Sequence, residues 1–334
     1  MTGPTLGDLS HSFLSRQRNI AIRQDISRYT HELSTGQVSD IRQVLSGNHS
    51  YLTDIEHKLE LLQGYSVTTT EAAHLSSATQ QALGAVSTIA QDLTNGLITS
   101  TLTVVGATNG NMASEAKTAL NDMIGRVNTQ VAGRFLFSGN ATDQRPLNDS
   151  DSLLTAALAA MAGATTLGDM MSAASNWFDD PAGFATVMYQ GSSEAMSPMK
   201  LSQTDSVSID LRATDSEFRE ILKLTTLTAL ADDPTFALTT EQKAQLFATA
   251  ADDMLVAQDS IIKLQAQVGT AEARIDKIAT RNAAEKSSLS IAKAGLLGVD
   301  PYEAATRLEE VQFQLQSLYS VISRNAQLSL VNFI

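Results

Sequence analysis

The stretch "MLVAQDSIIKLQAQVGTAEARIDKI", residues 254–278, decides the fold class. Apolar side chains recur along it in alternating steps of three and four residues without a break. They are Met254, Ala257, Ile261, Leu264, Val268, Ala271, Ile275 and Ile278. A helix with this repeat carries one apolar seam, which must pack against another helix. The stretch therefore predicts a long helix in a coiled coil or helical bundle.

Both ends of the chain carry the same helical spacing. Near the start, one apolar face consists of Ile22, Ile26, Tyr29 and Leu33, and "STG" at 34–36 predicts the end of that helix. Near the other end, the turn "GLLGVDP" (295–301) predicts a helix that opens at Pro301, because proline suits the first helical position. The stripe of this last helix consists of Leu308, Val311, Leu315, Leu318, Ile322, Leu330 and Phe333.

Further helices are predicted between these arms. Stripes run from Ile41 to Leu62, from Leu83 to Leu97 and from Ala116 to Val127, with a break at Gly106 and at 108–111. Long amphipathic helices cannot bury their stripes alone, so we expect the two arms to pack against each other. The terminal part of each arm has no third helix nearby in sequence. We expect other copies of the chain, or other proteins, to cover it.

The middle of the chain follows a different pattern. Residues 138–151 are rich in turn residues, "TAALAAM" (155–161) predicts a short helix, and 178–183 predicts a loop. Residues 187–189 and "SVSIDL" (206–211) are predicted to be strands. Helices resume near 214 and are interrupted at 231–242.

The predicted fold is mainly α with a small α+β insertion, and long N- and C-terminal helices pack as a coiled coil or helical bundle. Residues 1–40 and 300–334 are predicted to be terminal coiled-coil assembly arms. Residues 41–137 and 213–299 are predicted to form a helical-bundle core, and residues 138–212 an inserted outer domain.

Composition excludes several classes of function. A net charge of −13 and a pI near 4.8 argue against nucleic acid and anionic membrane surfaces as partners. The absence of cysteine excludes disulfides, thiolate catalysis and zinc–thiolate sites, and it favours export through an oxidising space. Residues 1–30 hold no continuous apolar leader. We expect a cytoplasmic protein, or one exported without a cleaved signal peptide.

Catalytic and metal-binding patterns are weak. His49 and His57 lie eight residues apart on about one helix face, where solvent-facing side chains are the better interpretation than a metal site. The acid pairs at 179–180, 232–233 and 252–253 fit turns and a helix start better than acid–base catalysis. The sequence contains no phosphate-binding loop and no nucleophile elbow. We expect no enzyme activity, no cofactor and no metal.

Several motifs resemble one known family. The block "GRFLFSGNATDQRPL" (133–147) holds an aromatic–apolar–aromatic group closed by glycine, then a proline followed by an apolar residue. The segments "ELSTGQ" (32–37), "VMYQGS" (187–192) and residues 300–334 add to the likeness. Together they resemble the bacterial flagellin superfamily and, within it, the type 3 hook-associated proteins of the hook–filament junction. The residues that carry this signature are Phe135, Phe137, Gly139, Pro146, Tyr189 and Gly191.

The resemblance implies a structural, extracellular protein of the flagellum, exported by the flagellar type III apparatus. It implies an adaptor that assembles through its terminal helices and templates flagellin polymerisation. The implied partners are other copies of the chain, the hook-side junction protein (hook-associated protein type 1), flagellin, and an export chaperone on the C-terminal arm. The implied assembly residues are Leu315, Leu318, Ile322, Leu330 and Phe333, with Ile22, Ile26 and Leu33 opposite them.

Two other functions remain open from the sequence. The segment after Gly36 and the first thirteen residues depart from the family pattern, which leaves a divergent filament flagellin as one alternative. An acidic helical composition would also suit a cytoplasmic coiled-coil scaffold. Recovery of the chain with flagella distinguishes the two flagellar roles from the scaffold.

Overall fold

The computed structural model describes residues 6–41, 49–102 and 109–331. The chain divides into two compact units. The arm unit consists of Met1–Gln63 and Ala283–Ile334, and the body unit consists of Gly64–Asn282. The long helices α3 (His49–Leu102) and α9 (Thr240–Leu297) each contribute residues to both units. The predicted three-part division of the chain stays a prediction.

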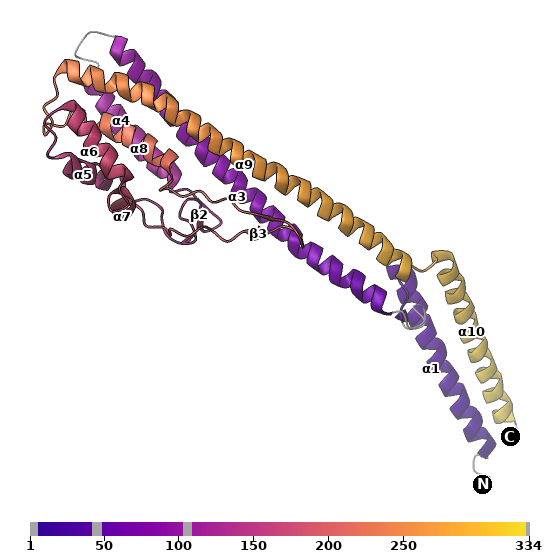
Figure 1. Cartoon of the computed structure of the whole chain (residues 1–334). Coiled ribbons are helices and arrows are strands. Elements are labelled where there is room, and N and C mark those ends of the chain that lie inside the picture. The colour runs from indigo at the N-terminus through magenta and orange to yellow at the C-terminus, as the bar shows by residue number, and fades with distance from the viewer. Residues whose placement is uncertain (1–5, 42–48, 103–108, 332–334) are drawn as a thin grey trace. The chain divides into compact units, whose positions relative to one another are not determined.

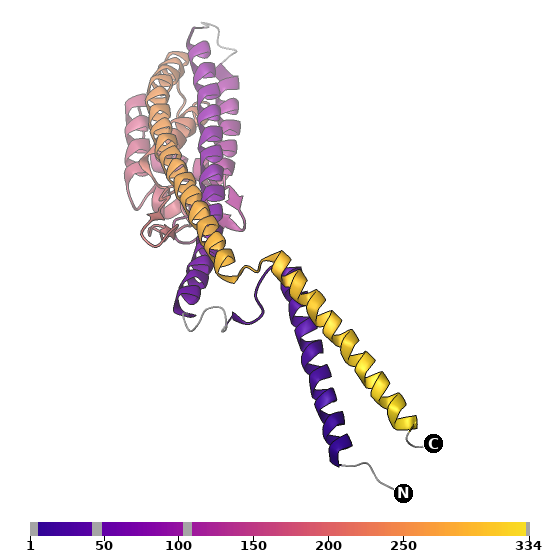
Figure 2. The same cartoon turned by 90° about the vertical axis from the view of Figure 1, so that its right-hand side faces the viewer.

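In the arm unit, α1 (Leu6–Thr35) packs along α10 (Pro301–Val331) in antiparallel fashion, so that the start of α1 and the end of α10 lie at the same end of the pair (Figure 2). Helix α1 is followed directly by Gly36, which has a φ of +69° that glycine adopts without strain. The segments that follow α1 and precede α10 pair with each other, because Val38 N donates to Leu297 O (2.9 Å) and Val299 N donates to Gly36 O (3.0 Å). The predicted helix end at 34–36 and helix start at Pro301 are confirmed.

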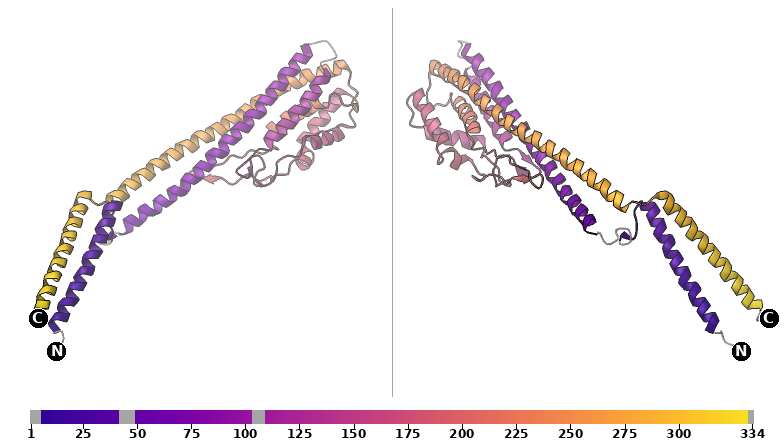
Figure 3. Two further views of the ribbon diagram at one scale, coloured as in Figure 1. Left: turned by 180° about the vertical axis from the view of Figure 1, so that it is seen from behind. Right: turned by 45° about the vertical axis from the view of Figure 1, so that its right-hand side comes forward.

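In the body unit, α3 and α9 run side by side (Figures 1 and 3). The seam predicted for 254–278 is buried at Met254, Ala257, Ile261, Leu264, Val268, Ile275 and Ile278, while Ala271 is partly buried. Helix α3 buries Leu83, Val86, Ala90, Leu93 and Leu97 in the same core. A polar contact joins the two helices where Gln258 Nε2 donates to Thr94 Oγ1 at 2.8 Å. The prediction of a long packed helix is therefore confirmed.

Shorter helices complete the body. Helix α4 (Asn109–Val127) packs on α8 (Ser216–Ala229), and α5 (Ser150–Met161), α6 (Leu167–Asp179) and α7 (Phe184–Met188) lie beside them (Figure 1). Two small antiparallel hairpins are present: β1 (Gln130–Val131) with β2 (Arg134–Phe135), and β3 (Met199–Lys200) with β4 (Ser206–Val207). The fold is mainly α with small β elements, as the sequence predicted.

Local structure in the middle of the chain partly differs from the prediction. The strand predicted at 187–189 is wrong, because Phe184–Met188 form helix α7. Phe184 and Met188 are four residues apart and both fully buried, a helical spacing that packs both side chains in the core. The strand predicted at 206–211 is limited to 206–207. The predicted helix at 155–161 and the interruption at 231–242 are confirmed. The break predicted at Gly106 lies outside the described residues, and the break predicted at 109–111 is wrong, because α4 begins at Asn109.

Candidate assembly interface

The apolar stripes predicted for the arms lie on the two helices that pack together. On α10, Val311 is buried, and Leu308, Leu315 and Leu318 are partly buried. On α1, the partly buried positions of the stripe are Ile22, Ile26 and Tyr29. Leu33 and Ile322, at the margins of the two stripes, are exposed. The side chain of Leu330 and the whole of Phe333 lie outside the described residues. The assembly role of this residue set stays a prediction.

Polar contacts link the two arm helices at their surface. Arg23 Nη2 of α1 donates a hydrogen bond to Tyr319 Oη of α10 at 2.9 Å. Hydrogen bonds from Arg23 and from Asn19 lower the pKa of the Tyr319 phenol below its usual value. On α1 itself, Arg28 pairs with Asp25 at 2.9 Å. Sequence reasoning missed the Arg23–Tyr319 contact, since nothing in a single sequence pairs two residues so far apart.

The arm pair leaves large apolar side chains exposed. Phe13 and Phe313 are 68% and 70% exposed, and Ile20 and Val321 are also exposed. At 3.6 residues per turn, Phe13 and Ile20 lie on the face of α1 opposite its packed stripe. Phe313 lies opposite the packed stripe of α10 in the same way. Exposed large apolar side chains on the outer face of each arm helix make that surface a candidate interaction site.

The stripes predicted from the sequence did not include this second apolar face. Its signal was present, since Phe13 and Ile20 are seven residues apart and so share a face of α1. The stripe on the other side of each helix has more apolar positions, and the prediction rested on that stripe. The candidate interface is therefore the outer surface of the α1–α10 pair, together with the ends of the predicted stripes.

The six signature residues come together in the body. The chain crosses itself there through three backbone contacts: Ser192 N donates to Ser138 O (2.9 Å), Gln190 N donates to Pro146 O (2.8 Å), and Leu147 forms an isolated bridge with Tyr189. Phe137 is fully buried and packs edge-on to Phe218, with ring centroids 5.0 Å apart. The signature residues therefore contribute to the packing of the body.

Close backbone approach explains the two signature glycines. Gly139 has a φ of +61°, and a Cβ there would lie 2.4 Å from Ser192 O. A Cβ at Gly191 would lie 2.5 Å from the ring of Tyr189. Tyr189 itself donates to Ser192 O at 2.9 Å, and burial raises its pKa to about 12. These residues hold the two crossing segments of the chain in close contact.

Among residues 6–41, 49–102 and 109–331, no group of three or more His, Asp or Glu side chains is placed to hold a metal ion. Nor does any helix in these described ranges combine the length and the apolar content needed to cross a membrane.

The C-terminal quarter of the chain matches a known family. Residues 252–334 match the model of the bacterial flagellin C-terminal helical region. The matched segment begins just before Met254 in α9 and includes all of α10. No curated protein sequence matches the chain.

Two solved structures share the fold. One is a protein from Vibrio parahaemolyticus described as a flagellar hook-associated protein, with a TM-score of 0.50 and 14% identity over 75% of this chain and 99% of that chain. The other is FlgL of Bacillus cereus, with a TM-score of 0.53 and 13% identity over 72% of this chain and 99% of that chain. These matches confirm the resemblance to flagellins and, at the level of fold, to hook-associated proteins.

Proposed function

We propose that the chain is a structural, non-enzymatic subunit of the bacterial flagellum that serves as the adaptor at the hook–filament junction. The observation that carries this proposal is the α1–α10 pair, which leaves residues such as Phe13 and Phe313 exposed. The match of residues 252–334 to the flagellin C-terminal helical region supports it. The fold shared with the two flagellar structures supports the junction in particular.

The arm surface supplies the energy of assembly in this proposal. Burying one large apolar side chain such as Phe313 contributes about 1.5–3 kcal/mol. Several such side chains on α1 and α10, buried together, offset the cost of ordering the subunits. Assembly then follows from contact between neighbouring arm pairs, in a ring or tube of identical subunits.

The proposed partners follow from the place of the adaptor. Copies of the chain contact each other, hook-associated protein type 1 lies on the hook side, and flagellin lies on the filament side, where the ring templates flagellin polymerisation. The chain reaches the outside of the cell through the flagellar type III apparatus. An export chaperone covers the C-terminal arm until assembly, because free apolar surface promotes self-association.

Deletion of the gene tests the proposal in the cell. Loss of an adaptor leaves hooks without filaments and releases flagellin into the medium. Re-expression of the full chain should restore filaments, and a chain truncated before Pro301 should not. Normal filaments in the deletion strain would contradict the proposal.

A filament flagellin is the second candidate, favoured by the flagellin family model that matches residues 252–334. The same deletion distinguishes it, since loss of a filament subunit leaves the junction proteins in place at the hook tip. Antibody labelling of isolated flagella gives an independent result. An adaptor labels only the junction, and a filament subunit labels the filament along its length.

Hydrogen exchange tests the assembly mechanism in the purified monomer. We expect faster exchange in α1 and α10 than in the body, and faster exchange still in α1 when residues 300–334 are removed, because α1 then has no helix to pack on. Strong protection of both arms in dilute solution would mean that the chain stabilises its own ends. In that case a self-contained scaffold would describe the chain better.

A further inference from the structure

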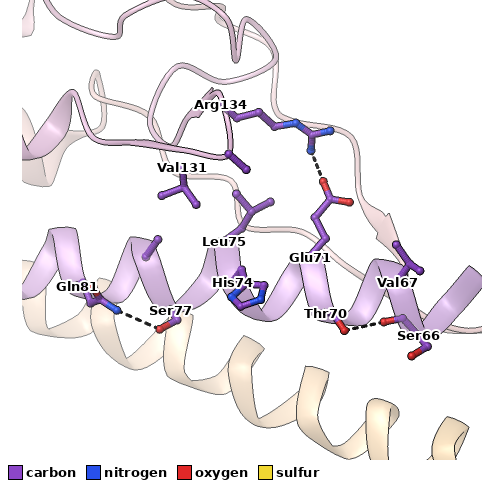
Figure 4. A pocket seen from close by; sticks show the side chains of 12 residues that line it. Ser66, Val67, Thr70, Glu71, His74, Leu75, Ser77, Gln81, Val131 and Arg134 are labelled. Atoms are coloured by element: carbon purple, nitrogen blue, oxygen red, sulfur yellow. Dashed lines mark hydrogen bonds and ion pairs between the residues drawn. The ribbon is translucent and has the colours of Figure 1, made fainter.

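A groove runs along α3 in the body unit. Its volume is about 760 Å³, and it is lined by α3 between Ser66 and Gln81 and by Val131, Ala132 and Arg134 of the first hairpin. Figure 4 shows Arg134 reaching over α3 to Glu71, and these two side chains form an ion pair at 2.5 Å. The groove therefore follows one helix for about four turns and is bounded on one side by the hairpin.

The groove opens away from α9. The α3 residues in the packed seam are Ala72, Ser76, Thr79 and Leu83, which are all buried. The exposed residues that line the groove are Ser66, Val67, Thr70, His74, Ser77 and Gln81. At 3.6 residues per turn, these two sets fall on opposite faces of α3. A ligand of the groove would thus approach from outside the helix pair.

Helix α9 presents an apolar ridge on its own outer face. Leu255 and Ile262 are 49% and 53% exposed, whereas Met254, Ile261 and Leu264 are buried in the seam. Leu255 and Ile262 lie seven residues apart, two turns along one face, and Asp259 stands between them. We call Leu255, Asp259 and Ile262 the α9 ridge. The ridge and the groove thus lie on opposite sides of the α3–α9 pair.

We propose that the α9 ridge of one copy of the chain docks in the α3 groove of a second copy. A groove that follows a helix for four turns suits a second helix laid along it. The Asp259 carboxylate on the ridge would meet the Arg134 guanidinium in the groove. Glu71 engages one nitrogen of Arg134, and a guanidinium has further donors to offer.

The placement of the two surfaces decides the kind of assembly. A contact between two different faces of the same protein is heterologous, and its repetition gives a ring or a helical tube. This is the symmetry that an adaptor subunit needs, so the inference rests on the proposed function and names a contact within it. The exposed face of the arms and a partner of another sequence are the competing occupants of the groove.

Cross-linking between single-cysteine chains tests this contact, since the natural sequence has no cysteine. Thr70→Cys or Ser77→Cys marks the groove, and Ala266→Cys marks α9 one turn beyond Ile262. The matched control is Gln267→Cys, an exposed neighbour that faces away from the ridge. Equal amounts of a groove chain and a ridge chain are mixed at high concentration and treated with a short bismaleimide. Circular dichroism first verifies that each variant is folded.

We expect the product that links a groove cysteine to Ala266→Cys, the groove–266 product, in about tenfold excess over the product that links it to Gln267→Cys. Docking raises the effective concentration of the first pair of thiols and not of the second. Asp259→Lys should reduce the yield several-fold, whereas Asp253→Lys, on another face of α9, should not. A dominant groove–groove product would overturn the proposal in favour of a symmetric contact. A dominant product between the groove and Phe313→Cys would overturn it in favour of the arm, and no mixed product at any concentration would also overturn it.

The result is independent of the cellular test. If the chain is found at the hook tip and the groove–266 product does not form, the docking contact is wrong and the adaptor function stands. If the product forms and the deletion strain makes normal filaments, the self-contact stands and the adaptor function falls.

Discussion

The two units differ in the burial of their phenylalanine side chains. In the body, Phe137, Phe178, Phe184, Phe218 and Phe247 are each less than 2% exposed, whereas Phe13 and Phe313 in the arms are 68% and 70% exposed. In the body, α3 and α9 are covered by further helices, so that side chains on several faces are enclosed. A pair of helices such as α1 and α10 can cover only one face of each. The body therefore encloses these aromatic side chains within one chain, whereas the α1–α10 pair leaves Phe13 and Phe313 exposed.

The largest expected effect is on the body core. Phe137→Ala should lower the free energy of unfolding of the body by about 3–5 kcal/mol, because it leaves a cavity beside Phe218. Phe313→Ala should change the free energy of unfolding of the monomer by no more than about 0.5 kcal/mol. Urea unfolding measures both free energies. The fluorescence of the single tryptophan, Trp177, reports the transition, because its ring packs 5.0 Å from the ring of Phe178 in the folded body.

Assembly should respond in the opposite order. Phe313→Ala should reduce the amount of chain recovered with isolated flagella. Phe137→Ala should reduce recovery only as far as it reduces the amount of folded chain. Equal destabilisation of the purified monomer by both substitutions would remove the contrast between the two units.

A second contrast uses two glycines with similar backbone angles. Gly36 in the arm unit and Gly139 in the body have φ values of +69° and +61°. Alanine at either position costs about 1–2 kcal/mol in backbone strain. At Gly36 the new Cβ meets no atom within 4 Å, whereas at Gly139 it would collide with Ser192 O and Glu194 O. Gly139→Ala should therefore cost about 1–3 kcal/mol more than Gly36→Ala.

Thermal unfolding followed by circular dichroism measures both glycine variants. Gly36→Ala should leave the main transition of the body unchanged and affect only the end of α1. If the melting temperature of the main transition shifts equally in both variants, the backbone at Ser192 can move to admit a Cβ at Gly139. The packing around Gly139 would then be looser than the structure indicates.

Acid should loosen one part of the body before the rest. Hydrogen bonds from Arg281 (2.5 Å) and Ser202 (2.8 Å) lower the pKa of Asp205 to about 2. Because the folded pKa is below the usual value of 3.8, this stabilisation is present above pH 3.8 and is lost as the pH falls toward 2. The hairpin of β3 and β4, which packs on Ala72, Ile275 and Ile278 through Leu201 and Val207, should then open locally.

Comparison with Asp205→Asn isolates this carboxylate. The variant should be less stable than the natural chain at neutral pH, and the difference in melting temperature should shrink steeply between pH 4 and pH 2. Arg281→Gln should reduce the same pH dependence. A difference that persists unchanged at pH 2 would show that Asp205 contributes packing and not charge.

The sequence predicted well what depends on local periodicity. The seam from Met254 to Ile278 and the helix boundaries at Gly36 and Pro301 agree with the structure because each follows from helix geometry or from one residue's backbone preference. Helix α7 was mistaken for a strand because a segment of five residues is too short to show a period.

The candidate interface was harder to predict for a physical reason. The stripe of Val311 and Leu315 is visible in the sequence, but the sequence does not state how many helices will cover α10. Only the packing shows that this stripe faces α1 and that Phe313 on the other side is left exposed. The signature residues around Gly139 were identified as a set by resemblance, and their role in close backbone approach became visible only in three dimensions.

The smallest expected effect distinguishes the two units through two tyrosines. Burial raises the pKa of Tyr189 in the body to about 12, and hydrogen bonds from Arg23 and Asn19 lower the pKa of Tyr319 in the arms. A lowered pKa means that the α1–α10 contact gains stability as the pH rises through that value.

Ultraviolet titration of the natural chain against Tyr189→Phe and Tyr319→Phe assigns each phenol. Arg23→Gln should return the pKa of Tyr319 toward its ordinary value, because it removes the hydrogen bond from Arg23 to the phenol. The pKa of Tyr189 should not change, because burial raises it and Arg23 makes no contribution to it. If Tyr319 titrates normally in the natural monomer, the arms are not paired before assembly, and the pairing of α1 with α10 belongs to the assembled state alone.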